Sequence, residues 1–340
     1  MKVRCSQIGF VKTNFSKHLS GQTLNSTISS EHITPTTIRF IKLGEKGMWE
    51  RSCIEDGTIR LGYDSPHHED SLAGRWDIVF NYWFNFRTGD HRKGTATRDI
   101  KQVRDFYELD SNTLWFTFYN RKLWWCFAQP EVTELEDLSR VRHTVNGWSS
   151  VDLTGRDLSI LNIDGRVTKV QGFRGTICGL EEMGEYLVRR INGLTPIDVI
   201  EAEAHLDGLA QSIKNLVHGL HWKDFELLTD LIFTQEGWQR TSELGKTEKD
   251  IDLDMFSPVT RRRAFVQVKS KGDLTTLNET ITAFEKMEGF DELFFVIHSP
   301  DVSIRNYTNS DRRINVIDDD RIADLVINAG LIRWLINKRS

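Results

Sequence analysis

The sequence predicts an α+β protein with two domains, on three observations. The chain has 340 residues, enough for two cores of ordinary size. Residues 37–128 show mostly short strand-like runs with one clear helix, and seven of the ten tryptophans lie before residue 150. This half is expected to form a small β-rich barrel, closed or half-closed. In the last third of the chain helical and strand patterns alternate, which predicts helices flanking a mixed sheet.

The composition excludes several classes of protein. The chain is 39% hydrophobic and 27% charged, which is normal for a globular protein. No apolar run approaches the ~20 residues that span a bilayer, and the first residues lack the apolar core of a signal peptide. The four cysteines lack Cys-x-x-Cys spacing, which argues against a zinc site. We therefore expect a cytoplasmic protein without membrane association, and the net charge of −5 leaves room for a local basic groove.

The pattern changes along the chain and predicts the domain boundaries. Two consecutive helices are expected before the last third of the chain, either as a spacer between domains or packed on one of them. The predicted divisions are an N-terminal arm at residues 1–35, a β-rich recognition domain at 36–175, a helical linker at 176–220 and a C-terminal domain at 221–340.

Hydrophobic periodicity predicts the individual elements. In the N-terminal half we expect strands at 37–43 and 57–63, a helix at 95–107, a hairpin at 113–119 and 123–128, and a further hairpin within 162–170. The linker helices are expected at 180–192 and 196–218. In the C-terminal domain we expect helices at 225–233, 274–287 and 322–336, and strands at 237–243, 250–255, 264–269, 292–297 and 314–317.

Charged side chains gather on two neighbouring predicted strands of the C-terminal domain. Alternate residues of a strand share a face, so Asp250, Asp252 and Asp254 lie together, as do Gln267 and Lys269. If the two faces coincide, carboxylate, amide oxygen and ammonium converge, a set that suits a hard divalent cation and a phosphate. The alternative is a surface pair of Asp and Lys, worth at most about 1 kcal/mol.

In this order the residues resemble a known family. Asp252 followed by Gln267-Val268-Lys269 is similar to the PD-(D/E)xK nuclease core, in the variant of the Mrr-like restriction endonucleases in which glutamine replaces the second acid. The resemblance extends upstream to 222–228 and 236–240 and covers about the last third of the chain. It implies a restriction-endonuclease-like fold for this part. The family often has a glycine-rich turn before the aspartate, whereas residues 245–249 contain a single glycine, so Asp250 and Asp254 stay alternatives to Asp252.

The resemblance implies a metal-dependent nuclease site. Asp252, the side-chain oxygen of Gln267 and the carbonyl of Val268 would bind Mg²⁺, with Mn²⁺ able to substitute. Glu226, on the preceding helix, would restore the charge that glutamine removes. Lys269 would orient or help to deprotonate the attacking water and offset charge on the transition state.

Three consecutive arginines lie between the two strands. Arg261, Arg262 and Arg263 are expected to contact the phosphate backbone of the substrate. The alternative is a solvated basic turn.

The aromatic N-terminal half resembles, by arrangement alone, the PUA-like superfamily of EVE, YTH and SRA modules. The resemblance implies a pocket that holds a planar base by stacking, with Trp49, Tyr63, Trp76 and Trp83 as candidates. Asp77 would accept a hydrogen bond from a base amino group. The alternative is that these aromatic residues are ordinary core.

Together the two resemblances imply a modification-dependent restriction enzyme of a bacterium or archaeon. The expected substrate is double-stranded DNA that carries modified cytosine, and a homodimer is expected because one site cuts one strand at a time. Two alternatives stay open. One is a non-catalytic reader of nucleic acid with a degenerate nuclease domain, and the other is a nuclease for RNA or branched DNA.

Overall fold

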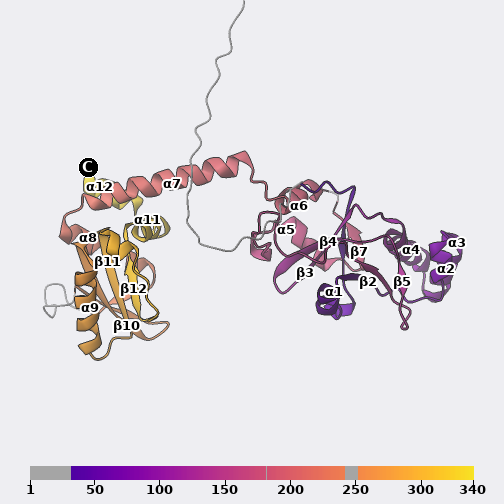
Figure 1. Ribbon diagram of the computed structural model, residues 1–340, viewed down its shortest axis with the longest axis horizontal. Helices are drawn as coiled ribbons and strands as arrows, with labels where there is room; N and C mark the ends of the chain where they lie inside the picture. Colours follow the sequence, from indigo (N-terminus) through magenta and orange to yellow (C-terminus); the bar gives the residue numbers. More distant parts are fainter. Residues whose placement is uncertain (1–31, 181, 242–251) are drawn as a thin grey trace, which may run out of the picture. The chain divides into compact units, whose positions relative to one another are not determined.

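The computed structural model describes residues 32–180, 182–241 and 252–340. It divides into two compact units, Met1–Thr195 and Pro196–Ser340, and each is described by itself. Figure 1 shows the elements of both units in sequence colours. No helix in the described ranges is both long and apolar enough to cross a membrane.

The first unit contains two sheets. The larger has the strand order β4-β3-β1-β7, and the smaller has the order β2-β6-β5. β1 runs parallel to β3 and antiparallel to β7, and β3 and β4 form the predicted hairpin. The bounds are β1 Thr37–Ile41, β2 Thr58–Leu61, β3 Thr113–Tyr119, β4 Lys122–Phe127, β5 Thr133–Glu134, β6 Arg140–His143 and β7 Ile177–Gly179.

The expected barrel is wrong: over the described residues the strands form two open sheets, joined by an isolated bridge between Ala128 and Thr144. The prediction of one helix among strands is wrong as well, because four α-helices lie between β1 and β3. They are α1 (Glu50–Glu55), α2 (His68–Leu72), α3 (Trp76–Phe86) and α4 (Arg92–Glu108), after a short 3-10 turn at Glu45–Gly47. Val79 and Trp83, one turn apart on α3, are buried with Ala96 of α4. Packing against α4 thus overrides the strand preference of the aromatic residues in α3.

The hairpin expected within residues 162–170 is replaced by short helical turns: η2 (Ile160–Asn162), α5 (Gly165–Thr168) and η3 (Lys169–Gly172). Asp164 begins α5 as its N-cap, since its side chain accepts a hydrogen bond from the Arg166 backbone nitrogen at 2.8 Å. Within the segment predicted as a linker, α6 (Gly184–Ile191) buries Leu187 and Ile191 in the core of the first unit. The following helix, α7 (Ile197–His218), belongs to the second unit.

The second unit is a five-stranded mixed sheet covered by helices, as the alternation of elements predicted. Its order is β12-β11-β10-β9-β8, with β10, β11 and β12 parallel and β9 antiparallel to both of its neighbours. The strands are β8 Gln239–Arg240, β9 Leu253–Ser257, β10 Arg262–Gly272, β11 Glu292–Pro300 and β12 Ile314–Ile317. The helices are α8 Trp222–Gln235, α9 Leu274–Lys286, α10 Val302–Arg305, α11 Asp319–Asn328 and α12 Ile332–Arg339.

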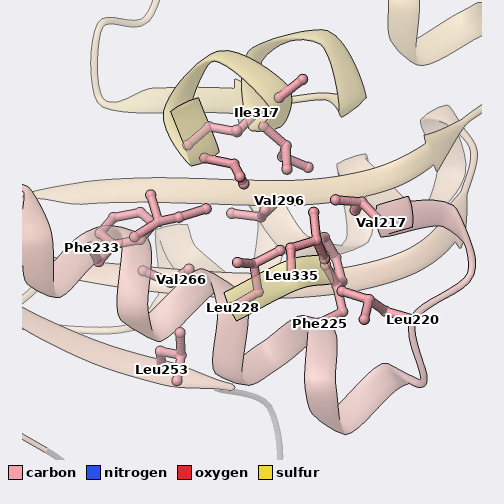
Figure 2. Packing of buried hydrophobic residues seen from close by; sticks show 14 of the residues in the cluster. Val217, Leu220, Phe225, Leu228, Phe233, Leu253, Val266, Val296, Ile317 and Leu335 are labelled. Carbon is pink, nitrogen blue, oxygen red and sulfur yellow. The ribbon is translucent and has the colours of Figure 1, made fainter. Parts of the chain in front are cut away.

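Alternation along β10 separates two cores. Val266 joins the larger core with α8, while Phe265 points to the other face and packs with Phe284 of α9. Figure 2 shows side chains of α8, among them Leu228, close to the sheet residues Val266 and Val296. This packing fixes α8 beside β10, which places the first turns of α8 near the strand that carries the predicted nuclease residues.

The single helix expected at 322–336 is two helices, α11 and α12. Gly330, between them, has a φ of 68°, a left-handed conformation that glycine adopts readily and that ends a helix.

Candidate active site

Asp252 lies immediately before β9, beside the middle of β10. The pairing of Leu253 with Val266 brings Gln267 next to Asp252. Oδ2 of Asp252 accepts a hydrogen bond from Nε2 of Gln267 and another from the backbone nitrogen of Val268, at 2.7 Å. Three of the predicted site residues therefore meet at one carboxylate, held by the antiparallel pairing of the two strands.

Lys269 follows on the same face of β10, two residues after Gln267. Its positive charge acts on Asp252 and lowers the pKa of that carboxyl, against the larger effect of burial. Within the described residues no hydrogen bond or ion pair engages the Lys269 ammonium. This cation is therefore available to a water molecule or a phosphate beside Asp252.

Glu226 brings a second carboxylate to Asp252 from the first turns of α8. Burial, and then the charge of Asp252, raise the pKa of Glu226, while Arg240 opposes the shift. Nη2 of Arg240, on β8, lies 3.9 Å from Glu226, and Nη1 of the same residue lies 3.4 Å from Asp230. Burial also raises the pKa of Asp252. The site thus holds two half-buried acids that repel each other.

The donor set fits a hard divalent cation. Asp252, Glu226 and the Gln267 amide oxygen are the oxygen ligands that Mg²⁺ takes, together with water and phosphate. The Gln267 amide nitrogen faces Asp252, and rotation of the amide by half a turn exchanges it for the oxygen. Burial is the main cause that raises the pKa values of both acids, so the folded site disfavours their negative charge. A cation at this place would balance it.

Asp254 is held differently, which separates it from Asp252. Arg263 donates to its two oxygens, at 2.9 Å from Nε and 2.5 Å from Nη2. The same guanidinium lies over the ring of Phe290, at 4.6 Å. Arg263 therefore neutralises Asp254, and of the two predicted aspartates in the described residues Asp252 is the one that stays a candidate metal ligand. Asp250 lies outside the described residues.

The three arginines lie at the opposite end of β10 from Lys269. Six residues separate Arg263 from Lys269, about 20 Å along a strand. Arg262 forms an ion pair with Glu292 at 2.7 Å, and Arg261 is exposed in the turn with a φ of 58°. The structure does not bring them to the acidic site, and contact with the DNA backbone stays a prediction.

The aromatic candidates of the first unit fall into two neighbouring clusters. Trp49 is half-buried beside the core of the sheets, with the Arg60 guanidinium 4.0 Å above its ring. The Tyr63 hydroxyl donates to Asp99 at 3.1 Å, and the Tyr63 ring meets Trp83 edge-on at 5.3 Å.

Trp83 is the most deeply buried of these rings, with 3% of its surface exposed. Trp76 is half-buried, and its indole nitrogen donates to Glu108 at 2.7 Å. Asp77 is exposed on α3. Tyr63, Trp76 and Trp83 share one cluster, and the predicted base contact stays a prediction.

Sequence reasoning did not single out Arg240 and Asp230, which flank Glu226. Their signal was available: Asp230 follows Glu226 by one helical turn, and Arg240 ends the 236–240 segment of the family pattern. A different acidic group, Asp318 to Asp320, has carboxylate oxygens within 4.8 Å of one another. Its buried member Asp319 is paired with Arg305 at 2.8 Å and lies 3.8 Å from the Lys214 ammonium, so protein cations already meet its charge.

Comparison with known families agrees with this geometry. Residues 217–326 match the restriction endonuclease family of the Mrr catalytic type. The matched segment, about a third of the chain, contains Glu226, Asp252 and the Gln267-Val268-Lys269 run. The resemblance to Mrr-like nucleases is confirmed: the second unit holds a restriction-endonuclease domain, a class that hydrolyses phosphodiester bonds of DNA.

Two solved structures are similar over most of the chain. One is the DNA modification-dependent restriction endonuclease AspBHI, with 11% identity and a TM-score of 0.30, over 83% of this chain and 79% of that one. The other is the MspJI restriction endonuclease in complex with a 27-mer oligonucleotide, with 12% identity and a TM-score of 0.22, over 84% and 74%. Both likenesses are too weak to support a conclusion about this chain. No curated protein matched the chain.

Proposed function

We propose that this protein is a Mg²⁺-dependent endonuclease that cuts double-stranded DNA carrying modified cytosine. The observation that carries the nuclease part is the Asp252 carboxylate, which is bonded to Gln267 and Val268 inside the matched domain. Beside it, the Lys269 ammonium has no hydrogen bond or ion pair among the described residues. The substrate is DNA because the matched family consists of restriction endonucleases.

Each residue of the site has a proposed role in phosphodiester hydrolysis. Asp252, the Gln267 amide oxygen and the Val268 carbonyl would hold the cation, with the Glu226 carboxylate beside them to balance its charge. A bound cation would polarise the phosphate and lower the pKa of water. Lys269 orients the attacking water and meets the negative charge that grows on the phosphate oxygens. Water oxygen bonds to phosphorus, the bond to one ester oxygen breaks, and that oxygen leaves with a proton.

Glutamine in place of a second strand acid suits the charge balance of this site. Asp252 and Glu226 already repel each other, which contributes to the raised pKa of Glu226. A third carboxylate at position 267 would lie within hydrogen-bonding distance of Asp252 and raise both pKa values further. The amide offers an oxygen ligand without that repulsion.

The first unit is proposed as the reader of the modified base. Support comes from the half-buried rings of Trp49, Tyr63 and Trp76 and from the exposed carboxylate of Asp77. We assign base contact to these four residues. Trp83 meets the Tyr63 ring edge-on and would hold that ring in place. A cytoplasmic homodimer is proposed, because cutting both strands of a duplex needs two such sites.

Cleavage of matched plasmids tests the proposal. One plasmid is unmodified and the other carries 5-methylcytosine or 5-hydroxymethylcytosine, each with Mg²⁺ or EDTA. The proteins are wild type, Asp252→Ala and the control Asp324→Ala, an exposed acid of α11. With Mg²⁺, we expect wild type and the control to cut only the modified plasmid. We expect no cutting by any protein in EDTA, and none by Asp252→Ala.

Each of the other possible outcomes would refute one part of the proposal. Equal cutting of both plasmids would refute the reader. Binding of DNA without cutting would refute the nuclease, and cutting of only RNA or branched DNA in parallel reactions would refute the duplex substrate.

A further inference from the structure

α4 carries more cations than its own acids can neutralise. Its acids are Asp99, Asp105 and Glu108, and each is bound by an arginine: Arg87 at 2.7 Å, Arg39 at 2.8 Å and Arg104 at 2.5 Å respectively. Two of these arginines come from outside the helix. The three acids of α4 are therefore already paired, and most of the cations of α4 have no acid on the helix to pair with.

Besides Arg92, which lies 4.4 Å over the Phe84 ring, the cations of α4 without an acidic partner among the described residues are Lys93, Arg98 and Lys101. All three are exposed, and no carboxylate pairs with them in the described residues. At 3.6 residues per turn they fall within an arc of about 140°, and Lys93 and Lys101 are about 12 Å apart along the axis. They form one face of the helix.

A fourth cation comes from the segment before β7. The Gln102 side-chain oxygen, on α4, accepts hydrogen bonds from the backbone nitrogens of Thr176 at 2.6 Å and Ile177 at 2.9 Å. Its amide nitrogen donates to the Arg98 carbonyl at 3.0 Å. Gln102 thus ties this segment to the helix one turn from Arg98. Arg174, two residues before Thr176, is exposed and also lacks a carboxylate partner among the described residues.

These four cations, none of which pairs with a carboxylate among the described residues, repel one another and would attract an anionic partner. Protein surfaces usually intersperse both signs of charge, and this chain is acidic overall, with a net charge of −5. The excess is therefore a local feature. A duplex carries one negative charge per ~1.7 Å of its axis, so a face ~12 Å long meets several phosphates. The nuclease domain in the same chain makes DNA the matching polyanion.

We propose that the α4 face (Lys93, Arg98, Lys101 and Arg174) binds the phosphate backbone of duplex DNA, independently of base identity. The inference rests on the proposed function and adds to it the surface by which the first unit holds its substrate. Phosphate contacts position a protein on the duplex, while base contacts specify the sequence or modification. The α4 face would give affinity, and the aromatic residues would give selectivity.

Binding measured without cleavage tests the α4 face. The full chain is titrated against a labelled unmodified 30-base-pair duplex in EDTA, by fluorescence anisotropy, from 50 to 300 mM salt. The variant is Lys93→Gln/Arg98→Gln/Lys101→Gln, and Arg174→Gln is tested alone. The control is Arg51→Gln/Arg75→Gln/Arg166→Gln, which removes the same charge from cations of the first unit that are paired with Glu55, Asp70 and Asp164.

In the triple variant, the slope of log affinity against log salt should become shallower by about 2.7. At 0.1 M salt, each lost phosphate contact should weaken binding about eightfold. In Arg174→Gln the same slope should become shallower by about 0.9. The control should bind like wild type, and thermal melts should coincide for all proteins. A slope and an affinity equal to wild type in the triple variant would overturn the proposal, and so would an effect on RNA but not on duplex DNA.

The design separates this inference from the nuclease assignment. If wild type cuts plasmid and the triple variant binds like wild type, only the α4 face fails. If the triple variant loses affinity as expected and wild type never cuts, the α4 face stands and the nuclease fails.

Discussion

Asp252→Asn is predicted to stabilise the protein while it removes cleavage. The pKa of Asp252 is raised by burial, which means that the folded state disfavours its charged form. Asparagine keeps an oxygen that accepts from Gln267 and Val268 and removes the buried charge. Removal of this buried charge is expected to raise the free energy of unfolding by about 0.5–2 kcal/mol. Loss of several kcal/mol of transition-state stabilisation lowers the cleavage rate about 10³-fold.

The stability gain of Asp252→Asn should depend on pH in a defined direction. A carboxyl whose folded pKa is raised contributes most favourably below its unfolded pKa, about 3.9, and this contribution is lost as pH rises through the folded pKa. The advantage of asparagine over wild type should therefore be smallest near pH 4 and largest at pH 8. Urea unfolding of the full chain at several pH values, with Asp324→Asn as the control, measures it.

Two results would refute this reasoning. If Asp252→Asn destabilised the protein by 1 kcal/mol or more at pH 8, the carboxylate would be part of a stabilising ion pair instead of an unbalanced charge. If the variant cut DNA at the wild-type rate, Asp252 would not be the metal ligand, and the assignment would pass to an acid outside the described residues.

Three further predictions concern the second unit. Asp254→Asn should lower the free energy of unfolding by about 1 kcal/mol, because Arg263 is 45% exposed, and should leave cleavage unchanged in the plasmid assay. Asp319→Asn should cost about 1 kcal/mol in urea unfolding, because Arg305 is 38% exposed and keeps Asp320 at 3.6 Å. Because the pKa of Asp319 is lowered in the fold, this difference should fade as pH drops below about 4. Gly330→Ala should cost about 1 kcal/mol from its left-handed backbone, with no clash to add, and a larger loss would show that the position is crowded.

The sequence was sufficient to predict which two strands bring Asp252 and Gln267 together, because two independent regularities agree there. Alternation placed Asp252, Gln267 and Lys269 on common faces, and the family pattern fixed which of those faces meet. The choice between Asp252 and Asp254 was not available from spacing, because both lie at alternate positions. It depends on Arg263, whose side chain turns back to Asp254 across the hairpin.

The first unit was predicted less well because its aromatic residues are ambiguous between strand and helix. In α3 eight of eleven residues are apolar or aromatic, so no face is marked by polarity, and the helix is decided by burial of Val79 and Trp83 against α4. The linker helices were found at nearly their true bounds. Their division between the two units depends on which core buries them, and spacing does not carry that information.

The two acidic groups of the second unit show why the number of acids does not locate a metal site. Asp318, Asp319 and Asp320 lie closest together, yet the buried Asp319 has a lowered pKa because Arg305 and other cations surround it. Asp252 and Glu226 come from separate elements and have raised pKa values. A site that is to bind a cation must keep negative charge that the protein leaves unbalanced, so the direction of the pKa shift separates the two groups. By this criterion Asp252 and Glu226 are the candidate ligands of a cation, whereas Asp319 pairs with Lys214 of α7 and Arg305 of α10.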